Sequence, residues 1–187
     1  MAPLRHLKLL YKLYPAWKVI AEYRYALELA KKYQCRRVLD VGCGRGNLGK
    51  VLLEGHPYLQ LYVGVDIYDI FMEVEDPRIN FIVLDAKNPP LMNRFDCIFF
   101  VNSVFYIGLD SLEKYRNLGN LIAIVDIDPS YPHIWVVDRF ESFFKGMRRS
   151  REGLITLLRN KGFDIIEEGG GATYYVVASC NRLLHRQ

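Results

Sequence analysis

The sequence predicts an α/β protein with a doubly wound, mostly parallel seven-stranded sheet, a final antiparallel strand, helices on both faces and a basic N-terminal helical extension. The first observation behind this prediction is an alternation of strand-like apolar runs with helical segments or turn residues. The second is that runs such as 97–101 and 121–125 are almost continuously hydrophobic, which is typical of parallel strands covered on both faces. The third is the short Gly-rich link 168–172, which leaves no room for a crossover helix, so the last two strands must pair antiparallel.

The N-terminal segment concentrates the positive charge of the chain. Residues 1–37 carry nine Lys or Arg against two Glu, although the whole chain has a formal net charge of only +4. Apolar and basic residues fall on separate faces at helical spacing over Pro3–Tyr14, and Pro15 suits the first turn of a second helix that runs to about Tyr33. Four interpretations stay open for the basic helix: a lid, an RNA-contacting face, a helix that binds an anionic surface, or a solvated helix packed on the domain.

The segment Val38–Gly46, VLDVGCGRG, predicts a buried strand that enters a tight turn. Glycine permits positive φ and lets a ligand approach the backbone closely, so the turn is expected to be a binding floor. The apolar residues of Asn47–Leu53 recur at spacings of three and four, which predicts a helix packed on the sheet. The free amides at the start of that helix would face whatever lies over the glycines.

The remaining strands are predicted from apolar runs that are separated by helical segments or turn residues such as Asp76-Pro77 and Asn88-Pro89-Pro90. They are expected at Leu61–Asp66, Ile79–Leu84, Asp96–Val101, Leu121–Asp126, Phe163–Glu167 and Tyr174–Ser179.

Length and composition predict one domain over residues 1–187, in which a basic helical extension at 1–34 precedes an α/β core at 35–180. No run resembles a transmembrane span or a secretory signal, so we expect a cytoplasmic protein. The cysteines are scattered singly, without metal-ligand spacing, and are expected to be reduced and mostly buried. We therefore predict no metal site.

The glycine motif and its spacing to later carboxylates resemble the class I S-adenosylmethionine-dependent methyltransferases. The match runs through VLDVGCGRG with Asp40 inside it, Asp66 at the end of LYVGVD, Asp85 at the end of INFIVLDA, FDCIFFVNSVFYI and LRNKGFDIIEEGG. The resemblance implies S-adenosylmethionine as cofactor and an enzyme that transfers its methyl group by in-line displacement to an unidentified acceptor. It also implies that Asp66 binds the ribose hydroxyls and that Asp85 approaches the adenine amino group. The cofactor-binding residues implied are Asp40, Gly42, Cys43, Gly44, Gly46, Asp66, Ile67, Asp85, Ala86 and Asn102.

The role of Asp40 has two interpretations, because a carboxylate in a buried strand needs a partner. It either accepts hydrogen bonds from turn amides and faces the cationic methionyl end of the cofactor, or it only braces the glycine turn. Asp66 and Asp85 also have a structural alternative, since each could cap the turn after its strand.

Two other glycine patterns overlap the same turn. Gly44, Gly46 and Gly49 match GxGxxG of dinucleotide-binding proteins, but Gly44 lies too far after the strand and Asp40 occupies the strand itself. Gly44 to Lys50 also matches the start of a phosphate-binding loop, but Val51 stands where that loop needs Ser or Thr. A cofactor-binding scaffold or partner subunit without turnover is the alternative from another class of protein, and a nicotinamide-dinucleotide-binding protein is less favoured.

No catalytic residue is assigned, because alignment of an activated methyl donor can suffice. Side chains that follow the fourth and fifth strands should border the cleft, and some of them could act as a base or only cap loops; they are Asn102, Ser103, Tyr106, Asp126, Asp128, Tyr131 and His133. The basic cluster Lys145, Arg148, Arg149 and Arg151 could extend an RNA-binding strip. The segment VNSV lacks the (D/N)PP(Y/F) signature of amide and amino N-methyltransferases, and the inter-strand loops are short, so a small-molecule acceptor is slightly favoured over RNA.

Overall fold

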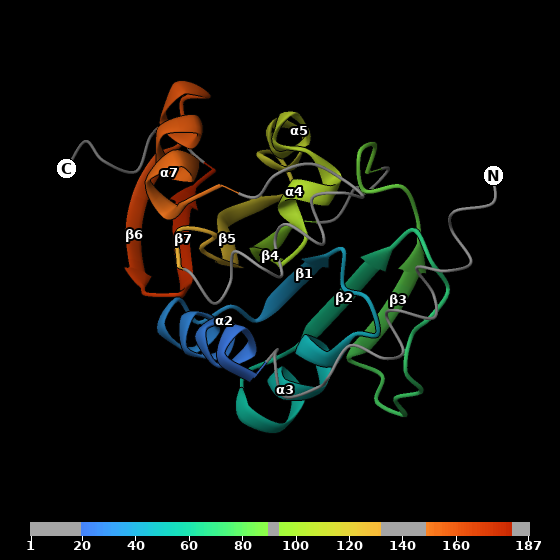
Figure 1. The fold of residues 1–187 in the computed structure, drawn as a ribbon. Coiled ribbons are helices and arrows are strands. Elements are labelled where there is room, and N and C mark those ends of the chain that lie inside the picture. The colour runs from blue at the N-terminus through green and yellow to red at the C-terminus, as the bar shows by residue number, and fades with distance from the viewer. Residues whose placement is uncertain (1–19, 90–93, 132–148, 181–187) are drawn as a thin grey trace.

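The computed structural model describes residues 20–89, 94–131 and 149–180, which form a single seven-stranded sheet in the order β3-β2-β1-β4-β5-β7-β6 (Figure 1). The strands β1 to β5 are mutually parallel, whereas β7 runs antiparallel to both β5 and β6. Their bounds are β1 Arg37–Val41, β2 Leu61–Asp66, β3 Ile79–Val83, β4 Phe95–Val101, β5 Gly119–Ile127, β6 Asp164–Gly170 and β7 Thr173–Ser179. The predicted sheet, with its antiparallel last strand, is confirmed.

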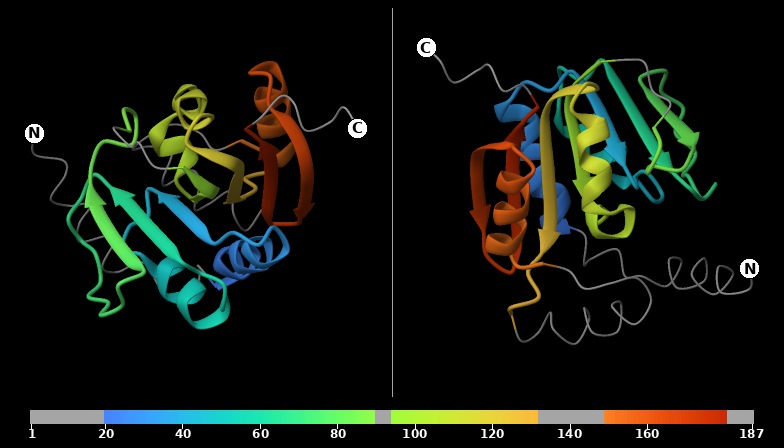
Figure 2. Two further views of the ribbon diagram at one scale, coloured as in Figure 1. Left: turned by 180° about the vertical axis from the view of Figure 1, so that it is seen from behind. Right: turned by 90° about the horizontal axis from the view of Figure 1, so that it is seen from above.

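Helices cover both faces of the sheet, as the sequence predicted (Figures 1 and 2). The helices α2 Ile20–Lys32 and α3 Asn47–Gly55 lie on one face. The other face carries α4 Val104–Ile107, the 3₁₀ turn η2 Leu109–Ser111, α5 Leu112–Tyr115 and α7 Arg151–Asn160. The predicted basic helix Pro3–Tyr14 and the start of the second helix at Pro15 lie outside the described residues.

Two apolar clusters divide the core by the alternation of side chains along the strands. Val38 of β1 packs with α2 and α3, whereas Leu39 and Val41 pack on the opposite face with α4, α5 and α7. By the same alternation, Asp40 lies on the α2 and α3 side of the sheet. This buried carboxyl therefore lies on the face of the sheet that the glycine turn and α3 cover.

The β3 edge differs from a regular succession of strands and helices. The described segment 67–78, which joins the parallel strands β2 and β3, contains no helix. Ile82 and Val83 of β3 are consequently exposed, although both belong to an apolar run. At the other edge, β6 extends to Gly170, so the link to β7 is shorter than the predicted one.

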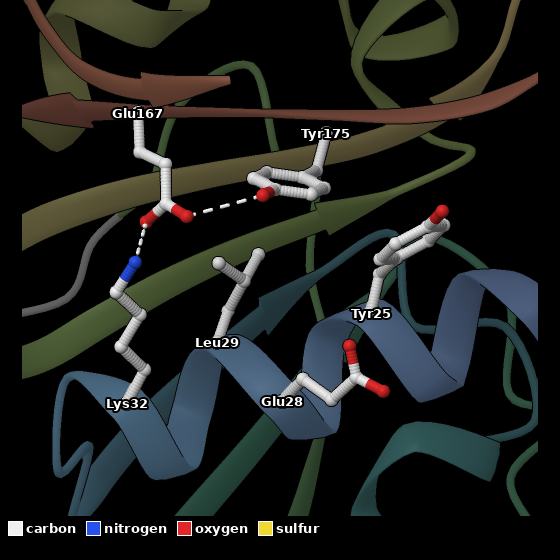
Figure 3. Close-up of a pocket in the computed structure, with 6 residues that line it drawn as sticks. All are labelled: Tyr25, Glu28, Leu29, Lys32, Glu167 and Tyr175. Carbon is white, nitrogen blue, oxygen red and sulfur yellow. Dashed lines mark hydrogen bonds and ion pairs between the residues drawn. The ribbon is translucent and has the colours of Figure 1, made fainter. Parts of the chain in front are cut away.

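Helix α2 is anchored to the C-terminal hairpin through Glu167 of β6. This carboxylate accepts hydrogen bonds from Tyr33 (2.6 Å) and Tyr175 (3.1 Å) and pairs with Lys32 (2.7 Å). Figure 3 shows the small pocket beside this network, where the rings of Tyr25 and Tyr175 lie 5.3 Å apart. The network joins the first described helix to the last strands of the chain, and it lies away from the glycine turn.

The structure corrects the prediction that all four cysteines are reduced. Cys35, just before β1, forms a disulfide with Cys97 of β4, and their Cα atoms are 5.6 Å apart. The parallel pairing of β1 with β4 brings these distant residues together, which no sequence spacing indicates. Cys43 and Cys180 are free and buried, as expected.

Reduction of the Cys35–Cys97 disulfide is expected to destabilise the fold, because the bond closes a loop with a sequence separation of 62. Chain-entropy arguments give about 4 kcal/mol for a loop of this size. Thermal unfolding with and without a reducing agent measures the effect. The Cys35→Ser/Cys97→Ser variant should unfold at the same temperature in both conditions. An unfolding temperature of the wild-type protein that does not change with the reductant would contradict the disulfide.

Within the described ranges, no helix is long and apolar enough to cross a membrane.

Candidate functional site

The chain reverses after β1 through a turn whose glycines adopt left-handed backbone conformations. Gly42, Gly44 and Gly46 have φ values of +73°, +56° and +84°. The amides of Gly42 and Cys43 donate to the carbonyl oxygen of Val65 in β2, at 2.8 and 3.0 Å. The turn is thus tied to the neighbouring strand, and α3 begins directly after it at Asn47.

Two of these glycines also have no room for a side chain. A Cβ atom at Gly46 would lie 2.2 Å from the ring of Phe81 in β3, and one at Gly42 would lie 2.6 Å from the Cβ of Ser103. The Ser103 hydroxyl donates to the carbonyl oxygen of Val41, which ties the end of β4 to the end of β1. The turn is therefore held by the carboxyl ends of β2, β3 and β4 together.

Asp66, the last residue of β2, reaches the same turn. Its Oδ2 accepts a hydrogen bond from the Gly44 amide at 2.9 Å, and its Oδ1 accepts one from the Tyr68 amide at 3.0 Å. Each carboxylate oxygen keeps a further lone pair, so a half-buried Asp66 can still accept two hydrogen bonds from a ligand. The carboxylate lies beside exposed Ile67, which follows it in the chain.

Asp40 is buried beneath the glycine turn. Its Oδ2 accepts a hydrogen bond from the Tyr62 hydroxyl at 2.6 Å, while its Oδ1 has no hydrogen-bond partner among the described residues. Burial raises the pKa of Asp40 to about 7; the Tyr62 hydrogen bond lowers it in part, and the nearby Asp66 charge raises it further. A buried acceptor without a donor marks a place where a ligand donor would be stabilised.

The remaining predicted cofactor residues lie at the ends of β3 and β4. Asp85 is exposed, and its Oδ1 accepts a hydrogen bond from the Lys87 amide at 3.0 Å, whereas the Ala86 carbonyl accepts one from Tyr115 at 2.6 Å. Asn102 has a φ of +52°, and its side-chain Oδ1 lacks a partner among the described residues. The structure thus brings the residues of all four strand ends to one edge of the sheet.

The candidates for a general base are placed differently. Asp128 accepts hydrogen bonds from the amides of Ser130 (2.9 Å) and Arg151 (3.1 Å), so it caps the loop after β5 and the start of α7. Asp126 is buried and accepts a hydrogen bond from the amide of Ile127 at 2.8 Å. His133 lies outside the described residues.

The basic cluster is only partly described. Arg151 pairs with Glu168 (3.4 Å) and donates to the Gly170 carbonyl (3.2 Å), so its charge is engaged with the C-terminal hairpin. Lys145 and Arg148 lie outside the described residues.

Sequence reasoning missed two residues that shape the site, Tyr62 and Phe81. Tyr62 binds Asp40, and its ring lies 2.7 Å from where a Cβ atom of Gly49 would be, so Gly49 is a packing glycine between α3 and β2. Phe81 packs under Gly46 and stacks on Phe71 with ring centroids 4.9 Å apart. Both residues occupy ordinary strand positions in the sequence. The one available signal was the tyrosine within the apolar run LYVGVD, because a buried tyrosine hydroxyl needs a polar partner.

The comparisons with known proteins agree with this geometry. The family model described as "Methyltransferase domain" matches residues 38–122, which include the glycine turn, Asp66, Asp85 and Asn102. No curated protein sequence matches the chain.

Solved structures share the fold at low sequence identity. The methyltransferase domain of bacterial CtHen1-CN is 14% identical with a TM-score of 0.61, and the match covers 84% of this chain and 96% of that one. The match to the mitomycin 7-O-methyltransferase MmcR (14% identity, TM-score 0.75) covers 95% of this chain and 58% of that one. The match to human N-acetylserotonin methyltransferase in complex with SAM (18% identity, TM-score 0.69) covers 94% of this chain and 55% of that one.

The sheet order, the helices on both faces and the glycine turn define a Rossmann-like methyltransferase fold. The methyltransferase family model thus matches the part of the chain that carries the glycine turn, and the chain shares its fold with methyltransferases of known structure.

Proposed function

We propose that the carboxyl edge of β1 to β4 holds S-adenosylmethionine and aligns its methyl group for transfer to a small-molecule acceptor. The residues that would hold the cofactor are Asp40, Gly42, Cys43, Gly44, Gly46, Asp66, Ile67, Asp85, Ala86 and Asn102. Ligands of open α/β sheets bind at the carboxyl ends of the strands, which is where these residues gather.

The observation that carries the proposal is the contact between the Asp66 carboxylate and the Gly44 amide, 2.9 Å apart. This contact supports the proposal, because the carboxylate that would accept from the ribose hydroxyls lies beside the turn on which the amino-acid end of the cofactor would lie. A second observation also fits S-adenosylmethionine. Among the described residues, Oδ1 of Asp40 is a buried acceptor without a donor, and the cofactor carries an ammonium group that can donate.

The cofactor, when bound, supplies a methyl group already activated by a sulfonium. The contribution of the chain is then to bind, orient and exclude water, and such alignment can lower a barrier by about 7 kcal/mol or more. Asp66 orients the ribose through two charge-assisted hydrogen bonds, each about 1.5–3 kcal/mol. No side chain is assigned as a general base.

A small-molecule acceptor is supported by the loops and by the end of β4. The loops 42–46 and 102–103 beside the candidate site are short, and the described residues contain no added substrate domain. The segment Val101–Val104 offers Asn102 and Ser103 rather than the planar-nitrogen signature, and Ser103 is engaged with the Val41 carbonyl. Two proteins that share the fold are named as methyltransferases of mitomycin and of N-acetylserotonin.

Isothermal titration with S-adenosylmethionine and with NAD tests the cofactor site, and we expect heat of binding from S-adenosylmethionine alone. Transfer of a labelled methyl group is then measured on a panel of phenols, carboxylic acids and amines, and on total RNA. Labelling of a small molecule supports the proposal. Labelling of RNA alone would replace it with the RNA interpretation of the basic N-terminal segment, and cofactor binding without any labelled product would favour a scaffold.

A further inference from the structure

The buried pair Asp40–Tyr62 has a feature that the methyl-transfer reaction does not use. Tyr62 donates to Oδ2 of Asp40 at 2.6 Å, and Oδ1 is buried without a hydrogen-bond partner among the described residues. Both side chains are essentially excluded from solvent. An ionised carboxylate with one unsatisfied oxygen is costly in such a place, and a protonated carboxyl costs less.

The described groups that face Asp40 add to this cost. Tyr62 and Asp66 belong to β2, Tyr23 to α2, and Cys43 to the glycine turn. All of them are neutral or acidic at neutral pH, and no described cationic side chain is among them. Among the described residues, the surroundings of Asp40 therefore lack a positive charge, which the amino-acid end of the cofactor would bring.

We propose that Asp40 is protonated in the cofactor-free protein near and below neutral pH, and that it releases this proton to solvent when the ammonium group of S-adenosylmethionine binds. The O–H bond of the carboxyl breaks, and the ammonium then donates a hydrogen bond to Oδ1. The inference rests on the proposed cofactor site. The ammonium is the partner, rather than the sulfonium, because only the ammonium has N–H donors to offer to an unsatisfied oxygen.

Tyr62 acts as a positioning residue for this exchange. Its ring is packed against Gly49 of α3 and lies edge-on to Phe81, with centroids 6.0 Å apart, so its hydroxyl is fixed in place. The hydroxyl occupies Oδ2 and leaves Oδ1 for the ligand. The same hydrogen bond stabilises the ionised carboxylate, which brings the proton release of Asp40 close to neutral pH.

Titration calorimetry in buffers of different ionisation enthalpy counts the protons exchanged on binding. With a pKa of about 7 for Asp40, wild-type protein should release about 0.9 proton at pH 6, and its affinity for S-adenosylmethionine should fall about tenfold for each pH unit below 7. S-adenosylhomocysteine, which keeps the ammonium but has no sulfonium, should release the same number. 5′-Methylthioadenosine, which lacks the ammonium, should bind without release.

Three variants separate this mechanism from a structural role. Asp40→Asn should bind without proton release and with an affinity that does not change between pH 6 and 7. Tyr62→Phe removes the hydrogen bond that stabilises the carboxylate, so the pH midpoint of binding should rise. Tyr33→Phe is the matched control, since it removes another 2.6 Å tyrosine-to-carboxylate hydrogen bond far from the turn and should leave the midpoint unchanged.

Unfolding of the cofactor-free protein gives a second readout that needs no ligand. The pKa of Asp40 is raised on folding, so its contribution to stability is present below pH 4 and is lost as pH rises to about 7. Asp40→Asn should lack this part of the pH dependence, and wild-type protein should show it.

The inference is overturned if wild-type protein releases no proton at pH 6, if Asp40→Asn releases as many as wild type, or if 5′-methylthioadenosine releases as many as S-adenosylmethionine. Asp66→Ala distinguishes this from a failure of the proposed site. If Asp66→Ala loses affinity but wild-type protein releases no proton on binding, only the inference about Asp40 is rejected and the proposed cofactor site stands. Unchanged affinity in Asp66→Ala would reject the ribose role of Asp66 alone, and no binding of S-adenosylmethionine to wild type would reject both the proposed site and the inference.

Discussion

Replacement of Asp66 by alanine is expected to weaken S-adenosylmethionine binding by about 2–4 kcal/mol, which is about 30- to 1000-fold in Kd. The substitution removes the acceptor proposed for both ribose hydroxyls, and it also removes the acceptor of the Gly44 and Tyr68 amides. Titration calorimetry measures the loss of affinity. Because two turn hydrogen bonds disappear as well, the thermal stability of the cofactor-free variant must be measured alongside.

Two comparisons separate ribose binding from the bracing of the turn. Asp66→Asn keeps the side-chain shape and one of the two acceptor oxygens, so it should lose one turn hydrogen bond, be less destabilised than Asp66→Ala and still lose affinity. Asp69→Ala removes an exposed carboxylate three residues further along the same loop and should leave affinity unchanged. An Asp66→Ala protein that binds as tightly as wild type would show that this carboxylate only caps the turn.

Replacement of Gly46 by alanine is expected to lower the free energy of unfolding by about 2–5 kcal/mol and to weaken cofactor binding with it. The residue has a φ of +84°, which costs an L-residue about 1–2 kcal/mol. In addition, the new Cβ would lie 2.2 Å from the Phe81 ring, and such overpacking costs about 1–3 kcal/mol. Denaturant unfolding of the cofactor-free variant measures the change.

Gly108→Ala is the control for this prediction, because Gly108 also has a positive φ of +96° but has nothing within 4 Å of its Cβ position. The free energy of unfolding of this variant should fall only by the cost of the positive φ, without the overpacking cost. The double variant Gly46→Ala/Phe81→Ala should lose less stability than the sum of the two single variants, since removal of the ring removes the clash. Additive losses in the double variant would show that Phe81 does not pack under the turn.

The glycine turn and Asp66 illustrate how much of the site was predictable. Glycine adopts positive φ without a steric penalty, so the three glycines after an apolar run indicated the turn directly. Asp66 was identified through the resemblance, from its place at a strand end twenty residues after Gly46, and its role in cofactor binding stays a prediction. The alternation of apolar runs with helical segments indicated an α/β sheet, and the short link before β7 indicated an antiparallel final pair, but neither gives the strand order β3-β2-β1-β4-β5-β7-β6.

Other features depended on which strands became neighbours. The Cys35–Cys97 pairing arises only because β4 lies beside β1, and the prediction of reduced cysteines was wrong for that reason. Asp128 stood as a possible base in the sequence, but its carboxylate is occupied by the amides of Ser130 and Arg151. Asp40 had two interpretations, and its hydrogen bond with Tyr62 showed where one of its oxygens goes.

The sequence by itself determined the parts that depend on local chemistry and periodicity: the strands, the left-handed glycine turn and the carboxylate at the end of β2. Only the tertiary structure decided the parts that depend on contacts between strands: the packing of Phe81 beneath Gly46, the hydroxyl of Tyr62 on Asp40 and the disulfide. The physical reason is that backbone conformation and burial periodicity are encoded in neighbouring residues. A contact between side chains from different strands depends instead on the order and register in which those strands pair.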